Sequence, residues 1–140
     1  MNEPLAKVIE KIRYADLLQF EGVEIDSPNT KGRPPFEETM LHAVAVWGVV
    51  DSARILLDEG AEIDPRGEHG YTPLHEATEQ GHKDMIDLLL ERGASTEIKS
   101  ETGSFFDIAA LSDKEEIRVL AEKLKLGEQG ASHNAGKPAS

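Results

Sequence analysis

The segment Gly70-Tyr-Thr-Pro-Leu-His-Glu-Ala77, continued by Gly81-His82 and by Leu88-Leu-Leu-Glu-Arg-Gly-Ala94, decides the fold. The same order of residue types occurs once before it, between Thr39 and Asp64. A repeat of this length indicates stacked helix pairs, none of which can bury its apolar face alone. The matched pairs, each 33 residues apart, are Thr39/Thr72, Leu41/Leu74, His42/His75, Val44/Ala77, Gly48/Gly81, Leu56/Leu89, Leu57/Leu90, Gly60/Gly93 and Ala61/Ala94.

Local signals predict where the two helices of the central unit begin and end. Thr72 is a good N-cap residue, and Pro73 suits the first helical position because its missing N–H has no partner there. We therefore expect a helix over 73–80 that Gly81 ends. The apolar spacing after Gly81 predicts a second helix to about residue 92, with Gly93 at its C-terminal cap.

This repeated segment resembles the ankyrin repeat, strongly over 39–99 and weakly over 4–26 and 101–124. The resemblance implies an all-α solenoid of about four helix pairs with short hairpin loops, comprising two central repeats and two degenerate caps. It also implies that His42 and His75 hydrogen-bond Thr39 and Thr72, three residues earlier. The expected domain covers 1–126, with an N-terminal cap at about 4–26, repeats at about 34–66 and 67–99, and a C-terminal cap at about 100–126.

Two segments interrupt or follow the repeats. Four residues of the stretch 27–36, Pro28, Gly32, Pro34 and Pro35, exclude a helix or central strand, so we expect a long, partly rigid loop there. The segment 127–140 is rich in Gly, Ala, Ser and Asn without periodicity, which predicts a disordered tail.

Composition limits the class of partner. The 140-residue chain has no cysteine, which excludes disulfides and cysteine-bound zinc. Its formal net charge of −12 argues against nucleic-acid binding and favours either a basic protein partner or simple solubility. Neither a secretory signal nor an apolar run of bilayer-spanning length is visible, so we expect a cytoplasmic protein that does not enter a membrane.

The sequence offers no set of residues suited to catalysis. Gly-x-Ser-x-Gly, His-Glu-x-x-His and phosphate-binding glycine-rich patterns are absent, and paired acids such as Glu37 and Glu38 are adjacent, as in solvated turns. His42 and His75 could suggest a metal site, but one full repeat separates them. We expect no enzyme activity, no cofactor and no metal.

Acidic residues concentrate in the segments expected to hold the hairpin fingers. Segments 19–39, 58–71 and 91–104 contain 13 acids and 5 bases, which gives −8 of the total charge of −12. Loops keep charges hydrated, which is one explanation. The other is that an acidic row of fingers attracts a basic partner.

The resemblance also suggests which residues face a partner. Trp47, the chain's only tryptophan, either packs against the N-terminal cap or exposes its ring on the concave side as a binding hot spot. Val8 and Ile9 would extend an apolar patch around it. The expected partner-binding residues are Phe36, Glu38, Val46, Trp47, Glu68, His69, Tyr71, Glu79 and Gln80.

Together these features predict a module that binds one partner protein through its hairpin tips and concave face. The chain is similar to small stand-alone bacterial ankyrin-repeat proteins, some of which are immunity proteins, so a role as an inhibitor of a basic toxin is one hypothesis. A general adaptor or scaffold and a self-associating module are alternatives. We expect a monomer or a weak homodimer.

Overall fold

The computed structural model describes residues 3–15, 17–35 and 37–133 of the chain. Within these residues the chain forms α-helices joined by turns and loops, with isolated β-bridges at Lys31/Thr39 and Ser100/Gly103. The elements are α1 (Glu3–Tyr14), the 3-10 turn η1 (Leu18–Phe20), α2 (Met40–Trp47), α3 (Val50–Asp58), the 3-10 turn η2 (Glu68–Gly70), α4 (Pro73–Gln80), α5 (Lys83–Glu91), α6 (Phe105–Ala110) and α7 (Glu115–His133).

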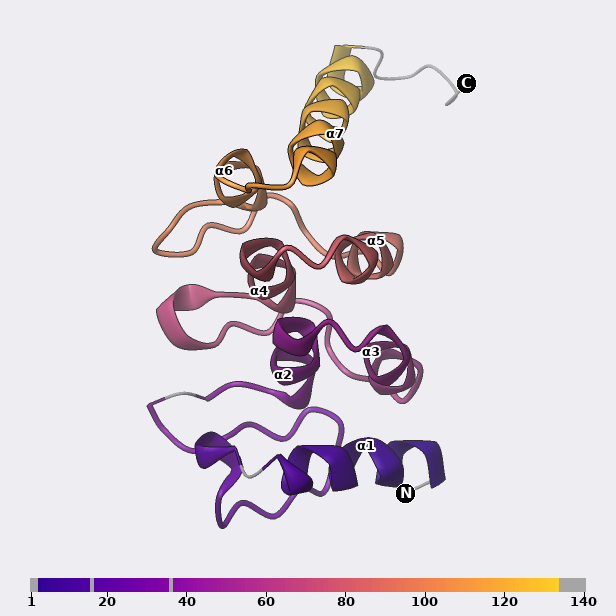
Figure 1. Cartoon of the computed structure of the whole chain (residues 1–140), viewed down its shortest axis with the longest axis vertical. Coiled ribbons are helices and arrows are strands. Elements are labelled where there is room, and N and C mark those ends of the chain that lie inside the picture. Colours follow the sequence, from indigo (N-terminus) through magenta and orange to yellow (C-terminus); the bar gives the residue numbers. More distant parts are fainter. Residues whose placement is uncertain (1–2, 16, 36, 134–140) are drawn as a thin grey trace.

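The helices form two columns (Figure 1). The inner column contains α2, α4 and α6, each packed on the next, while α1, α3 and α5 form the outer column. Loops project from the inner column between successive units (Figure 1), and we call the segments 61–71 and 94–103 the fingers. The predicted all-α repeat solenoid is therefore confirmed.

Helix boundaries in the two central repeats follow from capping. The side chains of Thr39 and Thr72 each accept a hydrogen bond from the third helical N–H, and the histidine at that position completes a capping box. Gly48 and Gly81 end α2 and α4 in the left-handed region, at φ 74° and 79°, where glycine is favoured. The predicted helix over 73–80 is confirmed.

Small and medium apolar side chains fill the space between the two columns. One continuous core runs from α1 to α7, with Leu56, Leu74 and Leu89 fully buried at the level of the central repeats. Each unit buries its apolar face only against its neighbours, as expected of a solenoid.

The N-terminal unit differs from the expected helix pair. Its described residues form one long α-helix, α1, which packs on α3 in the outer column, and the 3-10 turn η1 follows before α2. The side chains of Val8 and Ile9 are 2% and 9% exposed, so they belong to the core, and the predicted extension of the apolar patch was wrong. Their spacing with Leu5 and Ile12 forms a helical stripe that α3 covers.

The loop before α2 is tied to the first complete repeat. Asn29 donates its side-chain N–H to the backbone oxygen of Gly60 at 3.0 Å and accepts the N–H of Glu62 at 2.7 Å. Residues 27–35 contain no helix, in agreement with the prediction.

The C-terminal boundary also differs from the prediction. Helix α7 continues to His133, although we expected disorder from residue 127. Glu128, Gln129 and Ala131 are residue types with good helix propensity, and the penalty of glycine within a helix is only about 1 kcal/mol each. The remaining part of the expected tail, 134–140, lies outside the described residues.

Candidate interaction surface

One stripe of side chains repeats on all three inner helices. Positions separated by three and four residues share a helix face, and the repeat offset of 33 or 32 residues places the same face of each helix in register. We call these nine residues the inner row: Ala43, Val46 and Trp47 on α2, Glu76, Glu79 and Gln80 on α4, and Ile108, Leu111 and Ser112 at α6.

The inner row changes in character along the stack. On α2 it is apolar, with Val46 half-buried and the Trp47 side chain 37% exposed. On α4 it is acidic and polar, with Glu79 and Gln80 exposed. At α6 it becomes apolar again, because Leu111 is 80% exposed. An acidic stripe thus lies between two apolar ones.

Tyr71 acts as a support within this surface. Its ring is buried, only 8% exposed, and its hydroxyl donates to Glu79 Oε2 at 2.5 Å. The hydroxyl of Thr102, in the next finger, lies 2.7 Å from the same phenol oxygen. Tyr71 therefore fixes the carboxylate of an inner-row residue and does not itself offer a large contact area.

Four carboxylates from two repeats lie close enough to repel one another. Burial and repulsion by Glu38, Glu79 and Glu68 raise the pKa of Glu76 to about 7. The pKa of Glu38 is also raised, by burial and by the charge of Glu68. We call Glu38, Glu68, Glu76 and Glu79 the acidic cluster. A cation brought to this cluster would relieve the repulsion.

Glu76 was missing from the residues that the sequence indicated. It is the residue between the histidine and the alanine of the repeat motif, and its counterpart in the preceding repeat is Ala43. The spacing of three residues between Glu76 and Glu79 indicates, from the sequence alone, that both lie on one helix face. The approach of Glu38 from another repeat could not be read from the sequence.

The finger residue His69 is exposed and bonded to acids. Its Nδ1 atom lies 2.6 Å from Glu101 Oε2, and its Nε2 atom lies 3.6 Å from Glu68 Oε1. The contact with Glu101 raises the pKa of His69 above its usual value. Its side chain links two neighbouring fingers. Phe36, another expected contact residue, lies outside the described residues.

His42 and His75 are structural residues. Nδ1 of His42 accepts the backbone N–H of Thr39 at 3.0 Å, so the ring proton is on Nε2, which lies 2.9 Å from the Tyr71 backbone oxygen. Burial lowers the pKa of His42 to about 4 and also lowers that of His75. His75 repeats the contact with its threonine, Thr72, while its Nε2 atom lies 3.0 Å from the backbone oxygen of Ile98. The bond to Thr implied by the family resemblance is present in both repeats.

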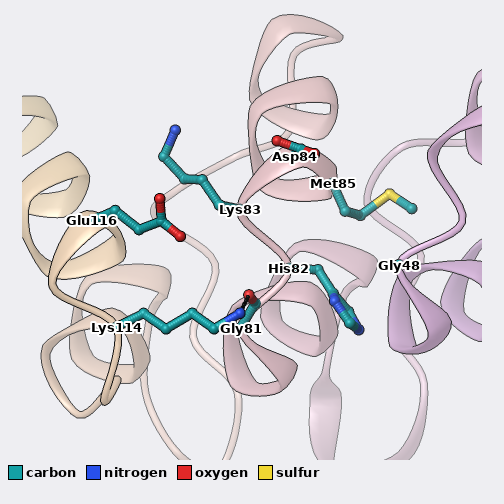
Figure 2. A pocket seen from close by; sticks show the side chains of 8 residues that line it. All are labelled: Gly48, Gly81, His82, Lys83, Asp84, Met85, Lys114 and Glu116. Carbon is teal, nitrogen blue, oxygen red and sulfur yellow. Dashed lines mark hydrogen bonds between the residues drawn. The ribbon is translucent and has the colours of Figure 1, made fainter.

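A cavity of about 270 Å³ lies at the turns between inner and outer helices. Figure 2 shows the residues that line it: Gly48, Gly81, His82, Lys83, Asp84, Met85, Lys114 and Glu116. The His82 ring points toward Gly48, and its Nε2 atom donates to the Val46 backbone oxygen at 2.8 Å. Lys114 reaches Gly81, whose backbone oxygen accepts from Nζ at 2.6 Å. The His82 ring and the Lys114 ammonium group thus join successive units of the stack. We therefore assign this cavity to the packing of repeats and not to ligand binding.

Among the residues that the structure describes, no group of three or more histidines and carboxylates is placed to hold a metal ion. None of the helices in that part of the chain combines the length and apolar character needed to cross a bilayer.

A family model described as ankyrin repeats, in three copies, matches residues 8–100. The chain is 37% identical over 73 residues to the E3 ubiquitin-protein ligase KEG of Arabidopsis thaliana, which covers 51% of this chain and 4% of that protein. It is 35% identical over 89 residues to the 26S proteasome non-ATPase regulatory subunit 10 of Dictyostelium discoideum, covering 63% of this chain and 36% of the relative.

The mouse ankyrin repeat and SOCS box protein 16 is 39% identical over 83 residues, covering 59% of this chain and 17% of that protein. The chain thus spans at most about a third of these relatives, from 4% to 36% of their length. Because their names describe different proteins, the shared part is the repeat region and not one common activity.

Proposed function

Because this chain belongs to the ankyrin-repeat family, we propose that it binds a single basic partner protein through its fingers and inner row. Its family and relatives support a protein-interaction module. The observation that carries the finer proposal is that the acidic inner-row residues of α4 follow a partly exposed Trp47 on the neighbouring inner helix α2. Aromatic burial would supply affinity, and the carboxylates would speed association with a partner of opposite charge.

The biological role that best fits such binding is occlusion in the cytoplasm. An acidic protein that covers the basic surface of a toxin would act as its inhibitor or immunity protein. Charge complementarity of this kind raises the association rate and makes it sensitive to salt.

An adaptor role is the second candidate. It is favoured by the names of the relatives, which include a ubiquitin ligase and a regulatory subunit of the proteasome. In that case the same surface would bind several partners with similar affinity.

Affinity capture from the source organism tests the proposal. Bait proteins would be the wild type, Trp47→Arg, Glu79→Lys and the control Glu91→Lys, which makes the same charge change on an exposed residue of the outer helix α5. The capture is repeated at about 0.05 M and about 0.5 M salt, where electrostatic screening differs strongly.

One dominant basic protein, retained by Glu91→Lys and lost with Trp47→Arg, Glu79→Lys or high salt, is the expected result. If that protein inhibits growth and co-expression of this chain relieves the inhibition, the immunity role is supported. Several partners of comparable yield would favour the adaptor, and equal capture by all four baits would reject this surface as the binding site. Recovery of only the bait's own chain would indicate self-association.

A further inference from the structure

The order of side chains along the inner row specifies more than the charge of the partner. Three inner helices present an apolar stripe, an acidic stripe and a second apolar stripe in that order. Packed helices lie about 8–10 Å apart. A ligand that follows the stack must therefore place an apolar, a basic and an apolar side chain at this spacing on one side of its backbone.

The acidic residue at the centre of the inner row, Glu79, is held in position before a partner binds. Glu79 is exposed, yet Tyr71 fixes one of its carboxylate oxygens through the hydroxyl bond at 2.5 Å. The other carboxylate oxygen of Glu79 takes no part in this bond. A carboxylate fixed before binding loses less side-chain entropy when it meets a cation. Glu76, three residues earlier on the same helix face, adds negative charge near Glu79 when its own carboxyl is ionised.

The spacing distinguishes among the regular conformations of a bound segment. A β-strand presents same-side residues at about 6.6 Å or about 13 Å, neither of which matches the helix spacing. Two turns of an α-helix advance about 10.8 Å, slightly beyond the range. A polyproline II segment has three residues per turn and rises about 3.1 Å per residue, so every third side chain recurs at about 9.3 Å on one side.

We infer that the inner row binds a polyproline II segment of a partner protein with a Lys or Arg three residues from an apolar residue on each side. The basic side chain contacts Glu79, while the flanking apolar side chains contact Trp47 and Leu111. This inference rests on the proposed function and adds the conformation and sequence pattern of the bound segment.

The test uses synthetic peptides and the whole chain. The probe is Leu-Pro-Pro-Arg-Pro-Pro-Leu, with acetylated and amidated ends. The first control has Glu in place of Arg, and the second, Leu-Pro-Arg-Pro-Leu, shortens both spacings by one residue. Binding is followed by the fluorescence of Trp47, the only tryptophan, and by amide chemical shifts.

We expect the probe to bind about tenfold more tightly than either control at low salt. Leu111→Ser and Glu79→Gln should each weaken binding about fivefold. The matched controls Leu18→Ser, a residue 58% exposed on η1, and Glu91→Gln should leave it unchanged. Leu111 and Leu18 are both exposed, so neither serine variant removes core packing.

Equal affinity for the three peptides, or no binding by the probe, would overturn the inference. Tighter binding of an alanine-rich helical peptide with the same residues at intervals of seven would replace polyproline II by a helix. These results are separate from the capture experiment, because Glu79→Lys can abolish binding of a natural partner even when the designed peptide fails. In that case the proposed function stands and only the bound conformation is rejected.

Discussion

The Nε2 atom of His42 lies 2.9 Å from the backbone oxygen of Tyr71, where the next repeat begins. The same ring accepts the backbone N–H of Thr39 within its own repeat. One neutral imidazole thus closes the start of α2 and joins two repeats. His75 caps α4 in the same way, and its Nε2 atom bonds the backbone oxygen of Ile98 in the following finger. Helix capping is thus coupled to the placement of that finger.

His42→Ala should lower the free energy of unfolding by about 3 kcal/mol, because it removes a capping bond, a bond between repeats and a buried ring. Urea denaturation followed by circular dichroism measures the change. The exposed His69→Ala is the control and should leave the free energy of unfolding nearly unchanged. Equal losses in the two variants would contradict the assigned role of His42.

The pKa values of His42 and Glu76 act on stability with opposite sign. The folded pKa of His42 is about 4, below the ordinary 6.5, because the fold favours the neutral ring. The stability that the neutral ring provides is therefore lost as the pH falls from 6.5 toward 4. The folded pKa of Glu76 is about 7, above 4.5, because the fold favours the protonated carboxyl. The stability that the protonated carboxyl provides is therefore lost as the pH rises from 4.5 through 7. The two slopes oppose each other between these limits.

Glu76→Gln removes the dependence of stability on pH that the Glu76 carboxyl causes. We expect the variant to be more stable than the wild type by about 1 kcal/mol at about pH 8, an amount that allows for solvent screening of this partly exposed group. The difference should shrink toward zero at about pH 4.5 and also decrease in high salt. Urea titrations across this pH range measure it. A difference that is independent of pH, or one matched by Glu91→Gln, would show that repulsion within the acidic cluster is not the cause.

The turn at Gly48 should tolerate no side chain. Gly48 has φ 74°, and an added Cβ would lie 2.7 Å from Cγ and Nδ1 of His82. Gly48→Ala therefore combines backbone strain of about 1 kcal/mol with displacement of His82 from the Val46 oxygen, for a total near 3 kcal/mol. Gly22 has φ 72° with no atom within 4 Å of the added Cβ, so Gly22→Ala isolates the strain alone. Thermal unfolding of both variants measures the two losses of stability. Equal losses would contradict the clash between the added Cβ and His82.

The parts of the fold that could be predicted depend on signals within one repeat. Thr72, Pro73 and Gly81 set the limits of α4 through local capping, so these limits could be read directly from the sequence. The position of α1 in the outer column could not, because the N-terminal unit departs from the repeat pattern and its place depends on packing against α3.

The candidate surface was predictable to the same extent. The exposure of Glu79 and Gln80 follows from their place in the repeat. For Trp47 the sequence left burial against the N-terminal cap and exposure on the concave side as alternatives, and the structure shows partial exposure. The raised pKa of Glu76 arises first from burial of its carboxylate and then from the charge of Glu38, 38 residues earlier. The support that Tyr71 gives to Glu79 likewise depends on how a finger folds over an inner helix, which no local pattern encodes.

The bond between Tyr71 and Glu79 can be measured apart from any partner. Tyr71→Phe removes the hydroxyl that joins Glu79 on α4 to Thr102 in the next finger. A double-mutant cycle of Tyr71→Phe with Glu79→Ala should give a coupling free energy of about 1 kcal/mol, because the acceptor is charged but exposed. The cycle of Tyr71→Phe with Glu91→Ala is the control and should give none, since Glu91 lies on α5 in the outer column. A coupling near zero for Glu79 would mean that its carboxylate is not held in place, and the preorganised central contact of the inner row would have to be abandoned.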